Sequence, residues 1–319
     1  MSAHTFCMSE FPGLIWSKLV TPRNILRPMS ESTTTEATTE ATATSAEDAI
    51  RTRFKADGYV VLPAVFTADE VNQMRAEADF ILDLIVNSSL YHQRQSRRLD
   101  IRRNNAGMVV RKIQPIIDLS LSLSRFSRDD RLLDAMRMLM DDEPVLMEEK
   151  LNYKQPVPVM DFFQVPEDDD RFPIHSDYAY YRHNGYPDSI ISSAVTMDQC
   201  HRDNGTILVF PGTHQCDIEH ERVRNGLAVP LGTVDLSEAV ALEIPAGSVV
   251  LFHSMLLHTS LPNETDAPRR LMIYSHYPKS ADMGIDIRNG PMRLVESPWE
   301  LGYLRDRTPD WEAPFSANA

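Results

Sequence analysis

The sequence is poor in cysteine, lacks a long hydrophobic run and has no excess of basic residues. Its 319 residues include three cysteines, Cys7, Cys200 and Cys216, which are too few for a disulfide framework and favour a cytoplasmic setting. No stretch approaches the roughly 20 apolar residues that cross a bilayer, and no secretory signal is evident, so we expect no membrane partner. The net charge of −14 argues against nucleic-acid binding, which needs a basic face.

The N-terminal region has a composition of its own, because residues 30–45 read SESTTTEATTEATATS. Such a tract cannot bury enough apolar surface to offset the entropy lost on ordering. We therefore expect residues 1–45 to be disordered, or to be an extension ahead of the true start, for which Met29 is a candidate. The remaining residues, 46–319, are predicted to form a single domain, since 42% hydrophobic residues suffice for one full core.

Helices are predicted in the first part of this domain. Ser45 is a candidate N-cap for a helix over residues 46–56, and a short buried strand follows at residues 59–63. Thr67 and Glu70 form a capping box ahead of a second helix. Ser127 and Asp130 have the same spacing ahead of a later helix.

Short strand-like runs predominate after about residue 145, at residues 192–200, 205–214 and 248–258. Between the first two, Asp203-Asn204-Gly205 predicts a hairpin turn. Helices followed by many short strands indicate an α+β, mainly β domain built on an antiparallel sandwich or jelly roll.

His175-Ser176-Asp177 is a candidate for part of a metal site. On a strand, residues i and i+2 face the same side, so both side chains can reach one ion. One imidazole and one carboxylate are two of the three ligands in the facial triad of a non-haem Fe(II) centre. The similar string His201-Arg202-Asp203 leads directly into Asn204-Gly205, so we assign it to the turn.

The candidates for a third ligand are His253 and His258, in FHSMLLHTS. In one regular strand, residues five apart face opposite sides, so only one of them can join the site. Arg269 follows eleven residues after His258. On an adjacent strand its guanidinium could bind the distal carboxylate of 2-oxoglutarate in a bidentate manner, with Ser260 adding a hydroxyl. Arg270 is then expected at the surface.

These motifs, in this order, resemble the phytanoyl-CoA dioxygenase family. The resemblance covers about residues 145–278 and is carried by His175-x-Asp177, DNGTILVFPGTH, GSVVLFHSMLLHTSLPN and Pro268-Arg269-Arg270. The strand GYVVLP and the helices beside it extend it to about residue 50. Within the family, HSDYAYYRHNGYP and LNYKQP are similar to the ectoine hydroxylase branch and to oxygenases of secondary metabolism.

The resemblance implies a double-stranded β-helix (a cupin-like jelly roll) with supporting N-terminal helices, and a requirement for Fe(II), 2-oxoglutarate and dioxygen. It implies that the catalytic iron is bound by His175, Asp177 and His258. It further implies that 2-oxoglutarate is bound by Arg269, Ser260 and Asn152.

Two differences within the family bear on reaction and substrate. Related halogenases replace the carboxylate ligand with a small residue so that chloride can bind the iron, so Asp177 favours hydroxylation. Asn152 matches an asparagine that contacts 2-oxoglutarate in the ectoine hydroxylases, but in the strand before it those enzymes carry glutamine and arginine where this chain has Glu148 and Lys150. That departure argues against ectoine as the substrate.

Three further features have two interpretations each. Tyr178, Tyr180 and Tyr181 could contact the substrate or belong to an aromatic core. The basic residues of segment 92–112 could cover an anionic substrate or form a solvated face. The string His214-x-Cys216-x3-His220 resembles a zinc site but lacks a fourth ligand at a fitting spacing, so we do not assign a metal to it.

The leading hypothesis is a dioxygenase that hydroxylates a small molecule and releases succinate and CO2, with secondary metabolism as one option for its role. The alternative is a catalytically silent jelly-roll protein that binds or regulates. A third possibility, a zinc- or manganese-dependent cupin-like enzyme, would have no use for Arg269. The oligomeric state stays open, with a homodimer as one option.

Overall fold

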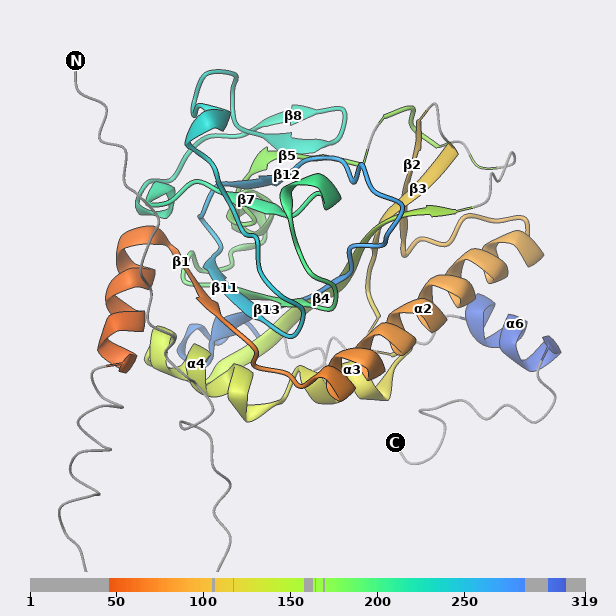
Figure 1. Cartoon of the computed structure of the whole chain (residues 1–319), viewed down its shortest axis with the longest axis horizontal. Helices are drawn as coiled ribbons and strands as arrows, with labels where there is room; N and C mark the ends of the chain where they lie inside the picture. The colour runs from red at the N-terminus through yellow and green to blue at the C-terminus, as the bar shows by residue number, and fades with distance from the viewer. Residues whose placement is uncertain are drawn as a thin grey trace, which may run out of the picture. The chain divides into compact units, whose positions relative to one another are not determined.

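The protein is described from a computed structural model, which covers residues 46–104, 107–116, 118–157, 163, 165–168, 170–284 and 298–307. The prediction for residues 1–45 lies outside these described residues. Residues 48–319 group together as one unit, and its fold mixes α-helices with antiparallel sheets (Figure 1).

The larger sheet has seven strands in the order β1-β11-β6-β13-β4-β3-β2, and every neighbouring pair is antiparallel. In chain order the strands are β1 (Tyr59–Leu62), β2 (Leu99–Asn104), β3 (Gly107–Ile113), β4 (Pro144–Val157), β6 (Ile191–Thr196), β11 (Val249–His253) and β13 (Leu271–Pro278). Strands far apart in the sequence are therefore neighbours in the sheet.

The smaller sheet has four strands in the order β10-β7-β12-β5. Its strands are β5 (Phe172–His175), β7 (Ile207–Val209), β10 (Val240–Ala241) and β12 (His258–Ser260). A separate hairpin joins β8 (Glu221–Val223) to β9 (Gly226–Ala228). Apolar side chains from both sheets form one core cluster that includes Ala194, Val209, Val250 and Ile273. Burial of these side chains holds the two sheets together.

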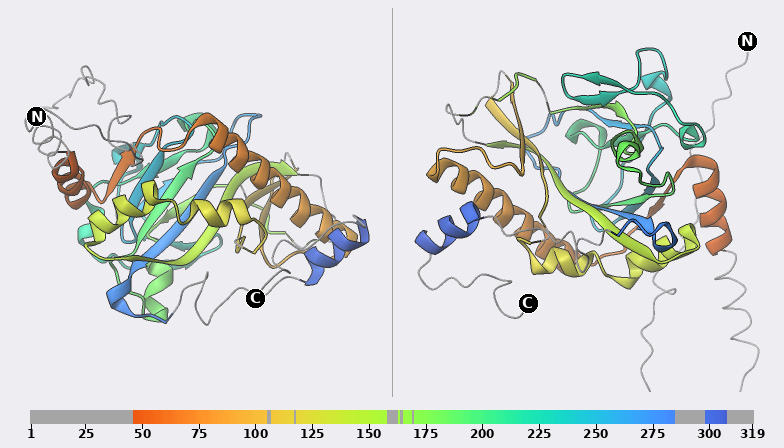
Figure 2. Two further views of the ribbon diagram at one scale, coloured as in Figure 1. Left: turned by 90° about the horizontal axis from the view of Figure 1, so that it is seen from below. Right: turned by 180° about the vertical axis from the view of Figure 1, so that it is seen from behind.

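Helices α2 (Ala68–Tyr91), α3 (Leu121–Phe126) and α4 (Asp130–Met140) pack on the larger sheet. The other helices are one over residues 46–57, α5 (Tyr178–Tyr181), which follows β5 of the smaller sheet, and α6 (Pro298–Arg307), which packs on α2. Figure 2 shows α2, α3 and α4 lying across the sheet. Two tyrosine hydroxyls connect these layers: Tyr153 of β4 donates to the Ala78 carbonyl of α2 (2.8 Å), and Tyr274 of β13 donates to the Leu123 carbonyl of α3 (2.6 Å). Helices on one side and the small sheet on the other explain why every residue of β6 and β13 is buried.

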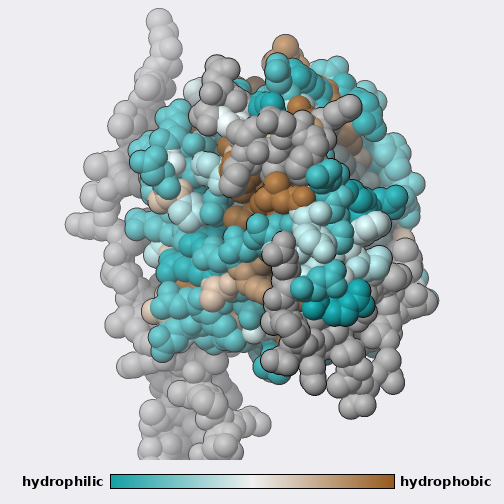
Figure 3. Space-filling view, turned by 90° about the vertical axis from the view of Figure 1, so that its right-hand side faces the viewer, coloured by the Kyte–Doolittle hydropathy of each residue, from teal (hydrophilic) through white to brown (hydrophobic). Residues whose placement is uncertain are grey.

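Short 3-10 helices lie between these elements. They are η2 (Arg182–Asn184), η3 (Arg202–Asn204), η4 (Thr213–Gln215), η5 (Leu236–Glu238) and η6 (Lys279–Ala281). On the side of the molecule that carries β2 and β3, hydrophilic residues surround a smaller hydrophobic area (Figure 3). Among the described residues, no helix is both long and apolar enough to span a membrane.

Three local predictions need correction. The helix α4 is capped by Asp129, whose carboxylate accepts from the Arg131 amide (3.0 Å), while Ser127 instead ends α3. Asp203-Asn204-Gly205 does not close a hairpin, because β6 and β7 on its two sides belong to different sheets. Residues 248–258 form two strands, β11 and β12, again in different sheets.

The predicted capping box is confirmed, and it gives a test of the helix start. The Thr67 hydroxyl accepts from the Glu70 amide (3.3 Å), and the Glu70 carboxylate accepts from the Thr67 amide (2.8 Å). Replacing Thr67 by Ala leaves the Glu70 amide without this acceptor, so we expect the free energy of unfolding to fall by about 1 kcal/mol in urea titrations. Thr52→Ala, at an exposed position inside the helix over residues 46–57, should leave stability unchanged or raise it. Equal losses in the two variants would contradict the cap.

Candidate active site

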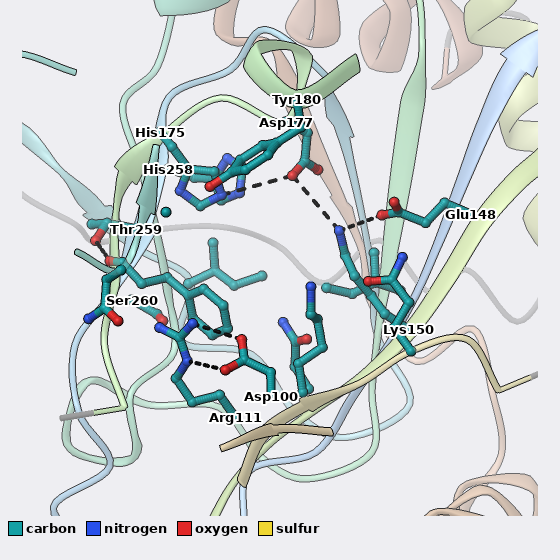
Figure 4. Close-up of a pocket in the computed structure, with 18 of the residues that line it drawn as sticks. Asp100, Arg111, Glu148, Lys150, His175, Asp177, Tyr180, His258, Thr259 and Ser260 are labelled. Carbon is teal, nitrogen blue, oxygen red and sulfur yellow. Dashed lines mark hydrogen bonds and ion pairs between the residues drawn. The ribbon is translucent and has the colours of Figure 1, made fainter. Parts of the chain in front are cut away.

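A cavity of about 460 Å³ is lined by residues of both sheets and of the β8–β9 hairpin. It has the size of an ordinary small-molecule site. Figure 4 shows a cluster of His175, Asp177 and His258 at one side of this cavity and the pair of Arg111 with Asp100 at the other. The cavity therefore brings chemically active groups from distant parts of the chain together.

The two histidines of the cluster meet through the pairing of β5 with β12. His175, the last residue of β5, lies directly opposite His258, the first residue of β12, and their ring centroids are 4.4 Å apart. Asp177 follows two residues later, with its Oδ1 3.9 Å from Nε2 of His175. One ligand atom from each of the three residues lies within 4.8 Å of the others, a spacing that suits a shared metal ion.

Backbone hydrogen bonds orient both imidazoles. Nδ1 of His175 lies 2.7 Å from the Pro173 carbonyl, and Nδ1 of His258 lies 3.0 Å from the Leu256 carbonyl. A carbonyl oxygen can only accept, so each Nδ1 carries a proton and Nε2 is the ring nitrogen left to bind a metal. That arrangement is typical of metal-binding histidines.

The electrostatics favour the protonation states that a metal needs. Burial and the nearby His258 lower the pKa of His175 to about 3, so its ring is neutral near pH 7. Burial alone would raise the pKa of Asp177, but Lys150 and His258 outweigh it and lower that pKa, so the carboxylate is ionised. Together with the imidazole of His258, a neutral His175 ring and the Asp177 carboxylate supply the types of ligand found in a facial triad.

Two expectations about the strands around these residues were wrong. Asp177 does not continue the strand of His175, because its backbone is already helical and leads into α5. His253 and His258 do not share a strand, so their difference in parity had no meaning. His253 ends β11 and packs against Phe54 and His214.

A second group of polar atoms faces the same cavity without partners. Arg269 is 1% exposed, and its Nε and Nη1 have no hydrogen-bond partner among the described residues. Within the same part of the chain, the Ser260 hydroxyl and the Asn152 Oδ1 are also buried without a partner. All three residues line the cavity. Buried polar groups are rarely left unpaired, so this group is suited to an anionic ligand that satisfies them.

Glu148 and Lys150 contribute a partly buried ion pair, at positions that the sequence marked only as a departure from relatives. Nζ of Lys150 lies 2.7 Å from Oε1 of Glu148 and 3.9 Å from Oδ1 of Asp177, and the Tyr181 hydroxyl donates to Glu148 (3.1 Å). Residues 148, 150 and 152 alternate along β4, so their side chains share one face of the strand. That alternation was the signal that could have placed Glu148 and Lys150 beside Asn152 in the site.

The family model named Phytanoyl-CoA dioxygenase (PhyH) matches residues 54–271, about two thirds of the chain. The chain belongs to this family. Ectoine dioxygenase from Sphingopyxis alaskensis is 26% identical over 237 residues, which are 68% of this chain and 71% of that protein. L-proline trans-4-hydroxylase from Streptomyces griseoviridis is 23% identical over 282 residues, 81% of this chain and 93% of that protein.

The chain is also similar to a relative of known structure. The crystal structure of EctD from S. alaskensis with 2-oxoglutarate and 5-hydroxyectoine has a TM-score of 0.51 and 26% identity, and it covers 72% of this chain and 76% of that chain. The PhyH-family chain described here is accordingly an enzyme, an oxidoreductase that depends on Fe(II), 2-oxoglutarate and dioxygen.

Other predictions about this PhyH-family chain turn out differently. Arg270 is not a surface residue: it is 7% exposed, and its guanidinium binds Asp198 (2.9 Å) and Asp79 (2.6 Å). Two carboxylates make its burial tolerable, which strand parity could not reveal. In the zinc-like string His214-x-Cys216-x3-His220, the His220 ring accepts a hydrogen bond from the Ser176 amide (2.9 Å). The cluster of His175, Asp177 and His258 is the only group of three potential metal ligands found among the described residues.

The tyrosines that follow Asp177 divide between the cavity lining and the apolar core. The strand does not continue to Tyr181, yet the turn of α5 still brings its side chain to the cavity. Tyr180 also lines the cavity, whereas Tyr178 packs beside the apolar cluster around Tyr277. Of the basic segment 92–112, Arg102, Arg111 and Lys112 line the cavity.

The partly buried His253 gives a prediction of how stability depends on pH. Burial and His214 lower its pKa to about 4, and its Nδ1 accepts from the Met255 amide (3.2 Å), which requires a neutral ring. The unfolded chain, with a histidine pKa of about 6.5, takes up the proton first as the pH falls. The contribution of His253 is therefore present above pH 6.5 and lost between pH 6.5 and 4.

Between pH 7 and pH 5, we expect the free energy of unfolding to decrease by about 1–2 kcal/mol less in His253→Gln than in the wild type, as measured by urea titrations at the two pH values. His183→Gln, at an exposed position, is the matched control and should keep the wild-type slope. An unchanged slope in His253→Gln would show that this ring titrates alike in both states.

Proposed function

We propose that this enzyme hydroxylates a small molecule and releases succinate and CO2, with residues 46–319 as one double-stranded β-helix domain in the cytoplasm. The observation that carries the proposal is that one cavity holds both the His175, Asp177 and His258 cluster and the unpaired atoms around Arg269. A seven-stranded and a four-stranded antiparallel sheet around that cavity support the proposed jelly-roll topology. The free thiols Cys200 and Cys216 support a reducing compartment.

In the proposed site, Nε2 of His175, Nε2 of His258 and a carboxylate oxygen of Asp177 bind Fe(II). The donor set fits this ion, because imidazole and carboxylate ligands on one face leave positions for the cosubstrate and dioxygen. When bound, the iron and 2-oxoglutarate supply the oxidising power that inserts one oxygen atom of O2 into a C–H bond, while the other enters succinate. The ionised Asp177 occupies the position that halogenases leave free for chloride, which supports hydroxylation.

Arg269 is proposed to bind the distal carboxylate of 2-oxoglutarate. Burial lowers the pKa of this guanidinium because it removes water from the charged group. A carboxylate that pairs with the guanidinium replaces that water and therefore forms a strong interaction. Ser260, two residues after His258, can donate its hydroxyl to the same carboxylate. Asn152, opposite Leu271 in the β4–β13 pair, contributes its side-chain amide nearby. These residues would orient the cosubstrate toward the metal.

The silent binding protein, our alternative, does not account for this arrangement. A protein freed from catalysis gains nothing from Arg269 buried without a partner, which costs stability. A zinc or manganese enzyme without 2-oxoglutarate would likewise leave Arg269 unexplained. The relatives named for ectoine and proline support a small, polar substrate, but Glu148 and Lys150 distinguish this site from that of the ectoine enzymes.

The metal assignment is tested by comparing the two histidines that the sequence left open. We expect His258→Ala to weaken Fe(II) binding in anaerobic titration calorimetry by more than the roughly 10- to 100-fold typical of residues that only orient a ligand. His253→Gln should bind Fe(II) as the wild type does, since its ring lies outside the cluster. Equal losses in the two variants, or none in His258→Ala, would rule out the proposed ligand set.

The cosubstrate assignment is tested by the weak visible charge-transfer band of the anaerobic complex with Fe(II) and 2-oxoglutarate. We expect Arg269→Met to raise the 2-oxoglutarate concentration at half-maximal absorbance by about 100-fold, because a buried bidentate pair is lost. Ser260→Ala removes one hydrogen bond and should raise it by about tenfold. Fe(II) affinity without 2-oxoglutarate should be unchanged in both. A wild type without this band would overturn the proposed function.

A further inference from the structure

The cavity is cationic although the chain is acidic. Three carboxylates line it, from Asp100, Glu148 and Asp177. The cationic side chains that line it are more numerous: Arg102, Arg111, Lys112, Lys150, Arg222, Arg224 and Arg269. Fe(II) and 2-oxoglutarate carry opposite double charges, so loading the enzyme leaves this surplus in place. A chain with a net charge of −14 has thus concentrated positive charge where its substrate must lie.

Some of these cations already have partners. Lys150 pairs with Glu148 (2.7 Å), and Arg111 pairs with Asp100 (2.7 Å). Arg102 shares Asp100 (2.7 Å). Arg269 is assigned to the cosubstrate. The side chains of Lys112, Arg222 and Arg224 form no hydrogen bond or ion pair with any described residue, so they remain available to a ligand.

The cations lie close enough to affect one another. Burial lowers the pKa of Arg102; Asp100 and Asp168 oppose this effect, whereas Arg111 and Arg224 add to it. Burial also lowers the pKa of Lys112, and Lys150 adds to that effect. Such crowding of like charge is unfavourable in the empty cavity and is relieved when an anion binds.

The hairpin that carries Arg222 and Arg224 is held in place over the cavity. The Leu227 amide donates to the hydroxyl of Tyr180 (2.8 Å), which lies beside His175. Nε of Arg102 donates to the side-chain oxygen of Asn225, between the two strands of the hairpin (2.9 Å). The β9 end is fixed as well, because the Val229 amide donates to the Ile174 carbonyl (2.9 Å). The hairpin backbone is therefore fixed relative to the triad, and the exposed Arg222 and Arg224 side chains line the cavity from it.

We propose that the substrate carries an anionic group, a carboxylate or a phosphate ester, which Arg222 and Arg224 bind while the carbon to be oxidised lies near His175 and Asp177. This inference rests on the proposed function and narrows its substrate class. Arginine suits the role, because its planar guanidinium binds both kinds of oxyanion in a bidentate manner. Arg102 and Lys112 line the same cavity and add to the attraction.

The test uses full-length enzyme loaded anaerobically with Fe(II) and saturating 2-oxoglutarate, so that Arg269 is already occupied. Titration calorimetry measures the affinity for phenylacetate, its neutral isostere 2-phenylacetamide, and phenyl phosphate. We expect both anions to bind more tightly than the amide, and the tighter of the two identifies carboxylate or phosphate as the recognised group. Their affinity should fall as the salt concentration rises.

The variant Arg222→Gln/Arg224→Gln should weaken anion binding by about tenfold or more and leave the amide unchanged. Arg51→Gln/Arg128→Gln removes the same charge at exposed positions away from the cavity and should bind as the wild type does. Anions that bind no better than the amide, or equal losses in the two double variants, would overturn the inference. The visible band tells a failure of the proposed function apart from a failure of this inference. If the band is absent, the proposed function fails; if the band is present, such results reject only the anionic substrate.

Discussion

The antiparallel pairing of β5 with β12 is the constraint on which the active site depends. It sets His258 opposite His175, and the chain then leaves the strand and turns helical at Asp177, the N-cap of α5, which brings Asp177 close to the two histidines. Since β5 and β12 are distant in sequence, the site exists only in the folded sheet. A shift of one residue in this register would turn the His258 side chain to the opposite face and separate the ligands.

Charge divides the cavity into parts with distinct tasks. Near the triad, burial keeps His175 neutral while Lys150 keeps Asp177 ionised, so the ligands are ready without rearrangement. Arg269 is fully buried with no ionic partner among the residues that the structure describes, which is costly for the protein alone and favourable once 2-oxoglutarate binds. Towards the β8–β9 hairpin the positive surplus is aimed at the substrate. Preorganisation of this kind places the cost of the site on folding and its benefit on binding.

Local signals in the sequence predicted much of this and failed at identifiable points. The capping box at Thr67 and the strand at residues 59–63 depend on neighbouring residues, so they could be read directly. The triad residues came from motif order, whereas the parity argument for His258 failed because residues 248–258 change sheets. Arg270 was misplaced because its partners, Asp79 and Asp198, are far away in the sequence. The role of the hairpin arginines had no local signal at all, since it depends on how β8 and β9 lie over a cavity built elsewhere.

The central claim is that one cavity holds the iron and the cosubstrate at the residues named. A crystal structure of the enzyme grown anaerobically with Fe(II) and 2-oxoglutarate, with anomalous data collected at the iron edge, tests it most directly. The account predicts one strong anomalous peak in contact with His175, Asp177 and His258, and 2-oxoglutarate density that ends at Arg269 and Ser260. An iron peak elsewhere, for example beside His214, Cys216 and His220, or a cosubstrate that leaves Arg269 without a partner, would contradict it.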